Sequence, residues 1–147
     1  MVNEELDYDT EQLKVQHEKS VISLNTYQKR AYEALIQSVE DEECHLFFIS
    51  GHDGTGKTFL WNTIISNLRS RLKIVFLVAT AGIVALLMPN GRTTHSRFYI
   101  PIDVTAESTC EIQYGSQLAE LLLKTSLIIW DEAPMESKLC VEVLDRT

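Results

Sequence analysis

Residues 49–60 read ISGHDGTGKTFL, a glycine-rich stretch that ends in a lysine and a threonine. The spacing from Gly51 through Gly56, Lys57 and Thr58 fits the phosphate-loop pattern G-x-x-x-x-G-K-T, against the alternative of a glycine-rich turn without a ligand. In such a loop, backbone N–H groups and the positive end of a helix dipole hold phosphates, the lysine adds a charge, and the hydroxyl ligates Mg²⁺. The predicted nucleotide-binding positions are Gly51, Gly54, Thr55, Gly56, Lys57 and Thr58.

Asp53 is an unusual residue for the middle of such a loop. Its carboxylate would lie near the γ-phosphate of a bound nucleotide. At about 5 Å and an effective dielectric near 20, each pair of like unit charges costs on the order of 3 kcal/mol. The sequence therefore predicts that Asp53 weakens triphosphate binding.

Length and composition are typical of one globular domain, with 147 residues, 45% of them hydrophobic and 23% charged. No apolar run approaches the length of a membrane span. Three cysteines, Cys44, Cys110 and Cys140, are too widely spaced for a disulfide framework or a zinc site, so we expect core or surface thiols. Residues 1–44 hold eleven acidic and four basic residues, against ten and nine in the remainder. The net charge therefore neither indicates nor excludes a nucleic-acid partner.

The apolar pattern alternates between strand-like runs and helix-like periods. Continuous apolar runs predict buried strands at 45–50, 73–79 and 127–130. Helical spacing predicts helices over 25–39, 57–68, 82–87 and 116–124, whereas 93–114 is expected to be mostly loop. Residues 1 to about 20 show no sustained apolar period and are expected to form a frayed leader or a short surface helix. The alternation predicts an α/β fold with a parallel sheet.

Two adjacent carboxylates, Asp131 and Glu132, end the apolar run at 127–130. Asp131 is placed to hold Mg²⁺ through water, and Glu132 to orient and deprotonate an attacking water. The alternative is a helix N-cap and a first-turn acid, because Ala133-Pro134 follows. The presence of a phosphate loop in the same chain favours the catalytic interpretation.

Four further residues have less specific patterns. Gln28 follows Asn25 at the capping-box spacing, so the residues alone favour a helix cap over a contact with adenine. His95 has no partner at metal-ligand spacing, which argues against a metal site there. Trp130 and Phe48 lie in predicted buried strands and are expected to be core aromatics.

Several stretches taken together resemble a known family: LNTYQKRAYEAL, FFISGHDGTGKTFLW, VATAGIVALLMPNGRTTHSRF, TCEIQYGSQLAELLLKTSLIIWDEAPM and the final LDRT. In order and spacing they resemble the N-terminal motor domain of Pif-type (petite integration frequency) DNA helicases, especially plant sequences related to Helitron mobile elements. The resemblance covers about residues 24–147, after an acidic leader of residues 1–23. It implies a three-layer RecA-like P-loop NTPase domain, and an ATP-dependent, Mg²⁺-requiring helicase on single-stranded or forked DNA. Such helicases act in the nucleus in repair, recombination or telomere maintenance.

The resemblance also implies roles for individual residues. It raises Gln28 to an adenine contact and supports the roles of Lys57, Thr58, Asp131 and Glu132. It implies DNA-backbone contacts at Thr80, Gly82, Thr94, His95 and Ser96.

The chain also departs from the family pattern. Family members have a small residue at the position of Asp53, and the later motifs, the arginine fingers and the second RecA-like domain do not follow Thr147. In similar folds, the strand after the Asp-Glu motif lies between the phosphate-loop strand and the Asp-Glu strand. The sequence lacks that later strand, which is a central element of the sheet, so we expect a truncated copy. Two functions follow: the motor half of an ATP-dependent DNA helicase, or a catalytically inactive nucleotide-binding or interaction remnant. A phosphate-loop kinase is disfavoured, because Glu132 suits water activation.

Overall fold

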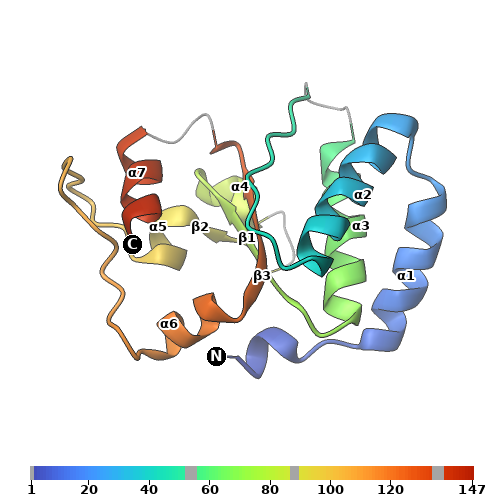
Figure 1. Cartoon of the computed structure of the whole chain (residues 1–147), viewed down its shortest axis with the longest axis horizontal. Coiled ribbons are helices and arrows are strands. Elements are labelled where there is room, and N and C mark those ends of the chain that lie inside the picture. The colour runs from blue at the N-terminus through green and yellow to red at the C-terminus, as the bar shows by residue number, and fades with distance from the viewer. Residues whose placement is uncertain (1, 52–55, 87–89, 134–137) are drawn as a thin grey trace. The chain divides into compact units, whose positions relative to one another are not determined.

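The computed structural model describes residues 2–51, 56–86, 90–133 and 138–147 (Figure 1). Asp53, Gly54 and Thr55 lie outside the described residues, so the predictions for them stay predictions. The chain forms two compact units, residues 3–75 and residues 76–147 together with the first two residues, and each is described by itself. Within the described ranges, no helix is both long and apolar enough to cross a membrane.

The first unit is built around helix α3, Lys57–Ser70. Helices α1, Thr10–Ile22, and α2, Thr26–Glu40, both pack against α3, and a short 3₁₀ helix, Glu4–Leu6, precedes them. On α3, the apolar residues Leu60, Ile64 and Leu68 are buried because helical spacing puts them on one face. The helices predicted over 25–39 and 57–68 are therefore confirmed.

Helix α1 belongs to the segment that was expected to be a frayed leader or a short surface helix. It is a 13-residue helix, and the Asp9 carboxylate caps it by accepting from the Gln12 backbone N–H at 3.1 Å. No residue of α1 is fully buried. Its half-buried residues Leu13, His17 and Val21 recur at helical spacing. The structure therefore shows a surface helix that packs on α3 along one face.

A polar network joins α1, α2 and α3 at the Tyr32 hydroxyl. His17 Nε2 lies 2.6 Å from Tyr32 Oη, and the Asn67 side-chain amide also donates to that oxygen. Since Asn67 supplies a donor, the hydroxyl proton of Tyr32 is available to a neutral His17. Burial lowers the pKa of His17, the Arg71 guanidinium lowers it further, and Glu18 opposes both. The network therefore favours the uncharged imidazole.

The strand predicted at 45–50 is wrong. Residues 43–51 have no regular secondary structure, and the side chains of Leu46 and Phe48 are 99% and 76% exposed. An apolar run forms a strand only where a neighbouring strand accepts and donates its backbone hydrogen bonds. None of the three described strands pairs with this segment. Phe48 is consequently not a core aromatic.

A sheet with strand order β2-β1-β3 organises the second unit. Strand β1, Ile74–Ala79, begins two residues before the unit and is buried at all six positions, as predicted. It pairs in parallel with β2, Arg92–Thr93, in the register Val78 to Arg92 and Ala79 to Thr93. These strands confirm the α/β class with a parallel sheet, and the three-layer arrangement stays a prediction.

Strand β3, Thr125–Asp131, confirms the strand predicted at 127–130 but not its burial. Ile129 is its one buried residue, and Ile128 is exposed. Trp130, expected in the core, is half-buried, although its indole nitrogen is buried and has no hydrogen-bond partner among the described residues. The lower burial follows from the position of β3 at one side of the sheet.

Within the described residues of this unit, the helices are α4, Gly82–Leu86; α5, Thr94–Phe98; α6, Gln117–Leu123; and α7, Lys138–Arg146. Helices α4 and α6 confirm the predictions for 82–87 and 116–124 over their described residues. The expectation of loop over 93–114 is wrong at its start, where Thr93 Oγ1 caps α5 by accepting from the Ser96 N–H at 3.3 Å. The pattern gave no expectation of α7.

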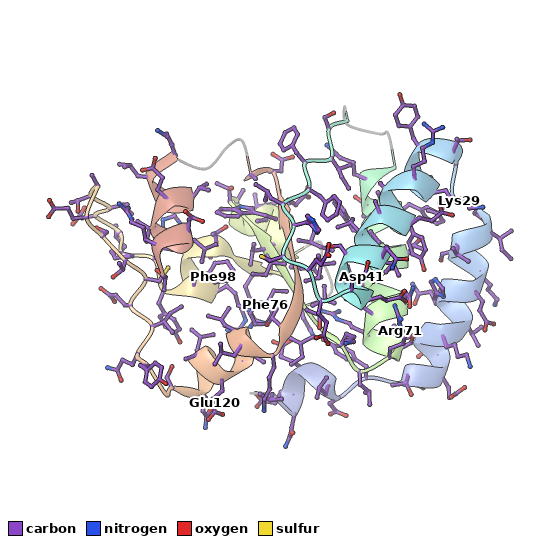
Figure 2. The ribbon with its side chains drawn as sticks, viewed as in Figure 1. Lys29, Asp41, Arg71, Phe76, Phe98 and Glu120 are labelled. Atoms are coloured by element: carbon purple, nitrogen blue, oxygen red, sulfur yellow. The ribbon has the colours of Figure 1, made fainter. Side chains whose placement is uncertain are left out.

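Two aromatic rings and a cation form the centre of the second unit's core. The ring centroids of Phe76 and Phe98 are 6.5 Å apart (Figure 2), and both side chains are fully buried. The Arg97 guanidinium lies 3.7 Å from the centroid of the Phe76 ring and is itself buried. This cation–π contact is one interaction that stabilises the buried charge of Arg97.

We predict that His17 makes the stability of the first unit depend on pH. Its pKa in the folded protein lies below the ordinary value of 6.5, so the unfolded chain binds the proton more readily. The stabilisation is present above pH 6.5 and is lost as the pH falls through the folded-state pKa. Urea unfolding between pH 7.5 and 5.5 should show a smaller loss of stability for His17→Gln than for the wild type. His45→Gln replaces an exposed histidine outside the network and is the control for a histidine substitution as such. Identical pH dependence in all three proteins would contradict the prediction.

Candidate functional site

The two ends of the predicted phosphate loop, Gly51 and Gly56, are described. The Lys57 ammonium donates to the Gly51 carbonyl oxygen at 2.6 Å, so the lysine spans the loop from one end to the other. Lys57 is also the first residue of the 14-residue helix α3, whose first-turn N–H groups have no partner within the helix. Thr58 follows with an exposed side chain. The free N–H groups, the helix dipole and the ammonium are suited to bind an anion.

Gly56 satisfies two constraints at once. It is the N-cap of α3 with φ of 82° and ψ of 22°, a left-handed conformation that favours glycine. A Cβ added to Gly56 would lie 2.5 Å from Gln28 Nε2, which is closer than a real Cβ approaches another heavy atom. The glycine is therefore required by its own backbone angle and by a neighbouring side chain.

Gln28 forms the predicted helix cap and also contacts the phosphate loop. Its Oε1 accepts from the Asn25 N–H at 3.0 Å, while Asn25 Oδ1 accepts from the Gln28 N–H at 2.9 Å, which completes a capping box. Its Nε2 donates to the Gly56 carbonyl at 3.1 Å. The capping interpretation is confirmed, and the adenine contact stays a prediction.

Asp131 and Glu132 lie at the end of β3, and both are half-buried. Glu132 has φ of 58°, a left-handed conformation that costs a residue with a Cβ about 1 to 2 kcal/mol. Its carbonyl oxygen accepts from Thr80 Oγ1 at 3.3 Å, so the residue that follows β1 helps to hold this turn. Unfavourable backbone conformations of this kind are concentrated at functional sites.

The chemistry of the candidate Mg²⁺ ligands fits that ion. Thr58 offers a hydroxyl oxygen and Asp131 a carboxylate, and Mg²⁺ is held by few protein oxygens together with water and substrate phosphates. Among the described residues, no group of three or more His, Cys, Asp or Glu side chains could hold a metal ion. Lys57 and Thr58 belong to the first unit and Asp131 and Glu132 to the second. Their convergence on one nucleotide therefore stays a prediction.

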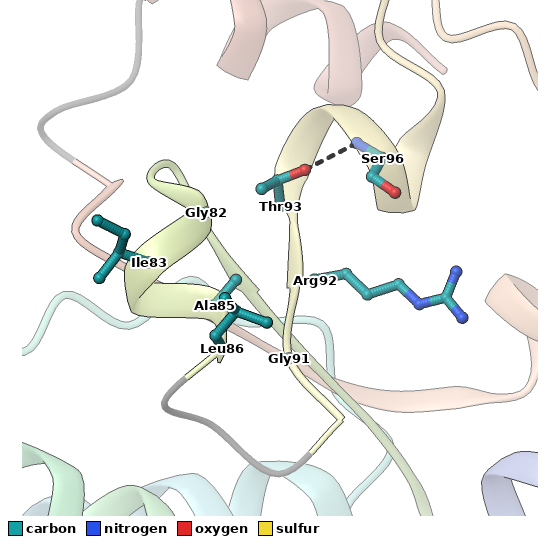
Figure 3. Close-up of a pocket in the computed structure, with 8 residues that line it drawn as sticks. All are labelled: Gly82, Ile83, Ala85, Leu86, Gly91, Arg92, Thr93 and Ser96. Atoms are coloured by element: carbon teal, nitrogen blue, oxygen red, sulfur yellow. Dashed lines mark hydrogen bonds between the residues drawn. The ribbon is translucent and has the colours of Figure 1, made fainter.

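A cavity of about 590 Å³ opens in the second unit between α4, β2 and α5 (Figure 3). Its lining includes Gly82 and Ser96, two of the predicted DNA-contact residues. The apolar side chains of Ile83 and Leu86, which also line it, are 78% and 85% exposed. Arg92 also lines the cavity and is exposed, and its side chain extends from β2 away from α4 (Figure 3). The sequence patterns did not indicate Arg92, although it is the one Lys or Arg residue of the stretch 80–96.

The remaining predicted DNA-contact residues are engaged within the unit. Thr94 is fully buried, and its hydroxyl donates to the Ala79 carbonyl at 3.3 Å. Thr80 donates to Glu132, and His95 Nε2 lies 3.7 Å from the Sγ of Cys140. The structure thus brings Gly82 and Ser96 to one open surface, whereas Thr94 has no exposed atoms to present. The expectation for the cysteines is met, because all three are free thiols, one exposed and two buried.

These features define the class of the protein: it is an α/β protein with a phosphate-loop sequence, and the last residues of that sequence, Gly56 to Thr58, form the N-terminus of helix α3. The sequence pattern of the PIF1-like helicase family matches residues 23–147, and the chain belongs to that family. It is similar to the ATP-dependent DNA helicase PIF4 of Trypanosoma brucei brucei (strain 927/4 GUTat10.1), with 28% identity over 130 residues. It is also similar to the ATP-dependent DNA helicase Pif1 of Psychrobacter sp. (strain PRwf-1), with 36% identity over 90 residues.

The two matches cover 86% and 60% of this chain. They cover only 15% and 14% of the respective relatives, so the chain spans a small part of their length.

We predict that Gly56→Ala destabilises the protein more than Gly115→Ala does. Both glycines have positive φ, 82° and 76°, but a Cβ on Gly115 would meet nothing within 4 Å. Each substitution should cost about 1 to 2 kcal/mol for the left-handed conformation. Gly56→Ala should cost about 1 kcal/mol more, because it displaces Gln28 from its hydrogen bond. Urea unfolding measures both costs, and equal values would show that Gln28 moves aside freely.

Proposed function

We propose that this chain is the ATP-binding part of an ATP-dependent DNA helicase motor. The observation that carries the proposal is the contact between the two ends of the phosphate loop, in which the Lys57 ammonium donates to the Gly51 carbonyl. In addition, Gly56, which has a left-handed backbone conformation, is the N-cap of the 14-residue helix α3. Membership of the PIF1-like helicase family supports ATP as the nucleotide and DNA as the substrate. The names of the two similar proteins agree with this assignment.

In the proposed mechanism, the loop from Gly51 to Thr58 binds the β- and γ-phosphates. Lys57 leaves the neutral Gly51 carbonyl for the phosphates, because the ammonium gains there the attraction between two opposite charges, which a neutral carbonyl does not supply. Thr58 and Asp131 would hold Mg²⁺, which supplies positive charge to the phosphate oxygens. Glu132 orients the attacking water and accepts its proton.

The proposed DNA surface is the cavity beside α4. Its exposed Ile83 and Leu86 side chains can contact a base, while Arg92 and Ser96 can contact the backbone. Backbone contacts of this kind suit single-stranded or forked DNA. A nuclear location, a place among plant Helitron-related sequences, and roles in repair, recombination or telomere maintenance belong to the proposal through the family resemblance.

A catalytically inactive nucleotide-binding remnant is the second candidate function. It is favoured by the segment before Gly51, which is exposed and has no strand neighbour among the described residues. A phosphate loop binds its ligand more tightly when the strand before it holds it in place, because less conformational entropy is then lost on binding. Binding of ATP without hydrolysis would fit this second candidate.

The test of nucleotide binding is a titration of the full chain with Mg²⁺-ATP. Lys57→Ala should weaken binding by about tenfold to a hundredfold, the range expected for a hydrogen bond to a charged group. Lys14→Ala removes an exposed lysine from α1 and should leave the affinity unchanged. Equal affinities for the wild type and Lys57→Ala would contradict the proposed site.

The effect of Asp53 is tested in the same titration. Removing its carboxylate should tighten Mg²⁺-ATP binding by about a hundredfold, from the repulsion of about 3 kcal/mol. Asp53→Asn removes the charge at nearly constant shape, and Asp53→Gly also removes the side chain. Both should bind alike if charge is the cause. Tighter binding by the wild type than by either variant would refute the prediction.

A further inference from the structure

Gln28 joins two sequence motifs that lie 28 residues apart, the capping box of α2 and the phosphate loop. The orientation of its side-chain amide is set by its two partners. The Asn25 N–H can only donate, so it requires Oε1, and the Gly56 carbonyl can only accept, so it requires Nε2. The side chain is half-buried between them. A single amide therefore fixes the start of α2 relative to the start of α3.

The carbonyl that Gln28 binds is the one on which the backbone ladder of α3 begins. The Gly56 oxygen also accepts from the Leu60 N–H at 3.1 Å, so it has a donor for each of its two lone pairs. The peptide group is planar and trans, with its C=O and N–H pointing in opposite directions. Fixing the Gly56 oxygen therefore fixes the direction of the Lys57 N–H. That N–H is one of the first-turn donors that have no partner within helix α3.

We propose that Gln28 is a positioning residue for phosphate binding: through the Gly56 carbonyl it aims the Lys57 N–H, whichever base the nucleotide carries. The inference rests on the proposed nucleotide site and assigns Gln28 a task separate from reading adenine. The two tasks are compatible. The amide keeps one N–H and one lone pair free after its contacts with Asn25 and Gly56.

The chain offers a matched set of variants. Gln28→Ala removes both contacts of the side chain. Gln28→Glu can still accept from the Asn25 N–H, as the glutamate of a capping box does, but it cannot donate to Gly56. Asn25→Ala removes the cap acceptor for the Gln28 N–H and leaves the Gln28 side chain with both of its partners. Comparing the three separates the cap from the contact with the loop.

The experiment titrates the full chain with Mg²⁺-ATP and with Mg²⁺-tripolyphosphate, a probe that carries phosphates and no base. Gln28→Ala and Gln28→Glu should weaken both ligands by about threefold to tenfold, the range for one neutral hydrogen bond. Asn25→Ala should change neither by more than about twofold. The charge of the glutamate adds repulsion that salt screens, so Gln28→Glu should approach Gln28→Ala in about 0.5 M NaCl.

Two results would overturn the proposal. Weaker binding of ATP with unchanged binding of tripolyphosphate would mean that Gln28 reads the base. An equal loss in Asn25→Ala would mean that the cap alone matters.

A wild type that binds neither ligand would instead refute the proposed function, and hydrogen exchange then decides the positioning role without a ligand. Exchange of the Leu60 amide, which donates to the Gly56 carbonyl, should be threefold to tenfold faster in both Gln28 variants but not in Asn25→Ala. Unchanged exchange would overturn the proposal.

Discussion

The burial of β1 is the constraint on which the second unit depends. All six residues of Ile74–Ala79 are buried, so their N–H and C=O groups need partners within the protein. The neighbouring strands, β2 on one side and β3 on the other, supply these hydrogen-bond partners. Two hydroxyls then join the ends of the strands: Thr94 donates to Ala79, and Thr80 donates to Glu132. The end of β3, where the catalytic candidates lie, is therefore hydrogen-bonded to the residue that follows the central strand. In parallel sheets, ligands bind at the carboxyl ends of the strands.

The elements that the sequence predicted correctly are those with a strong local signal. Helices α2 and α3 have a clear helical period, and β1 is a continuous apolar run that the sheet buries completely. The same signal gave a wrong strand at 45–50, because hydrophobicity describes a residue's preference and not the presence of a pairing partner. The docking of α1 on α3 escaped prediction for a related reason. His17 of α1 meets the hydroxyl of Tyr32 on α2, which Asn67 of α3 also contacts, and an apolar period does not reveal such a polar contact.

The candidate site shows the same division between local pattern and long-range contact. Spacing predicted both the capping box at Asn25 and the phosphate loop at Gly51 to Thr58, yet no local pattern shows that Gln28 meets Gly56. The family resemblance also grouped Thr94 with Ser96 as DNA contacts, although the first is fully buried and the second lines an open cavity. The difference arises because Thr94 lies next to β1, where its hydroxyl is needed to pair a buried carbonyl.

Helix α1 packs within the first compact unit, residues 3–75, but lies outside the region that matches the family, residues 23–147. The family pattern begins at residue 23, one residue after α1 ends. A recombinant protein trimmed to that limit would retain every recognisable motif. It would nevertheless uncover one face of α3 and leave Tyr32 without the imidazole beside it. Shortened versions for biophysical work should therefore start ahead of the Asp9 cap, because sequence relatedness marks what evolution has kept in common and not where a stable fragment can be cut.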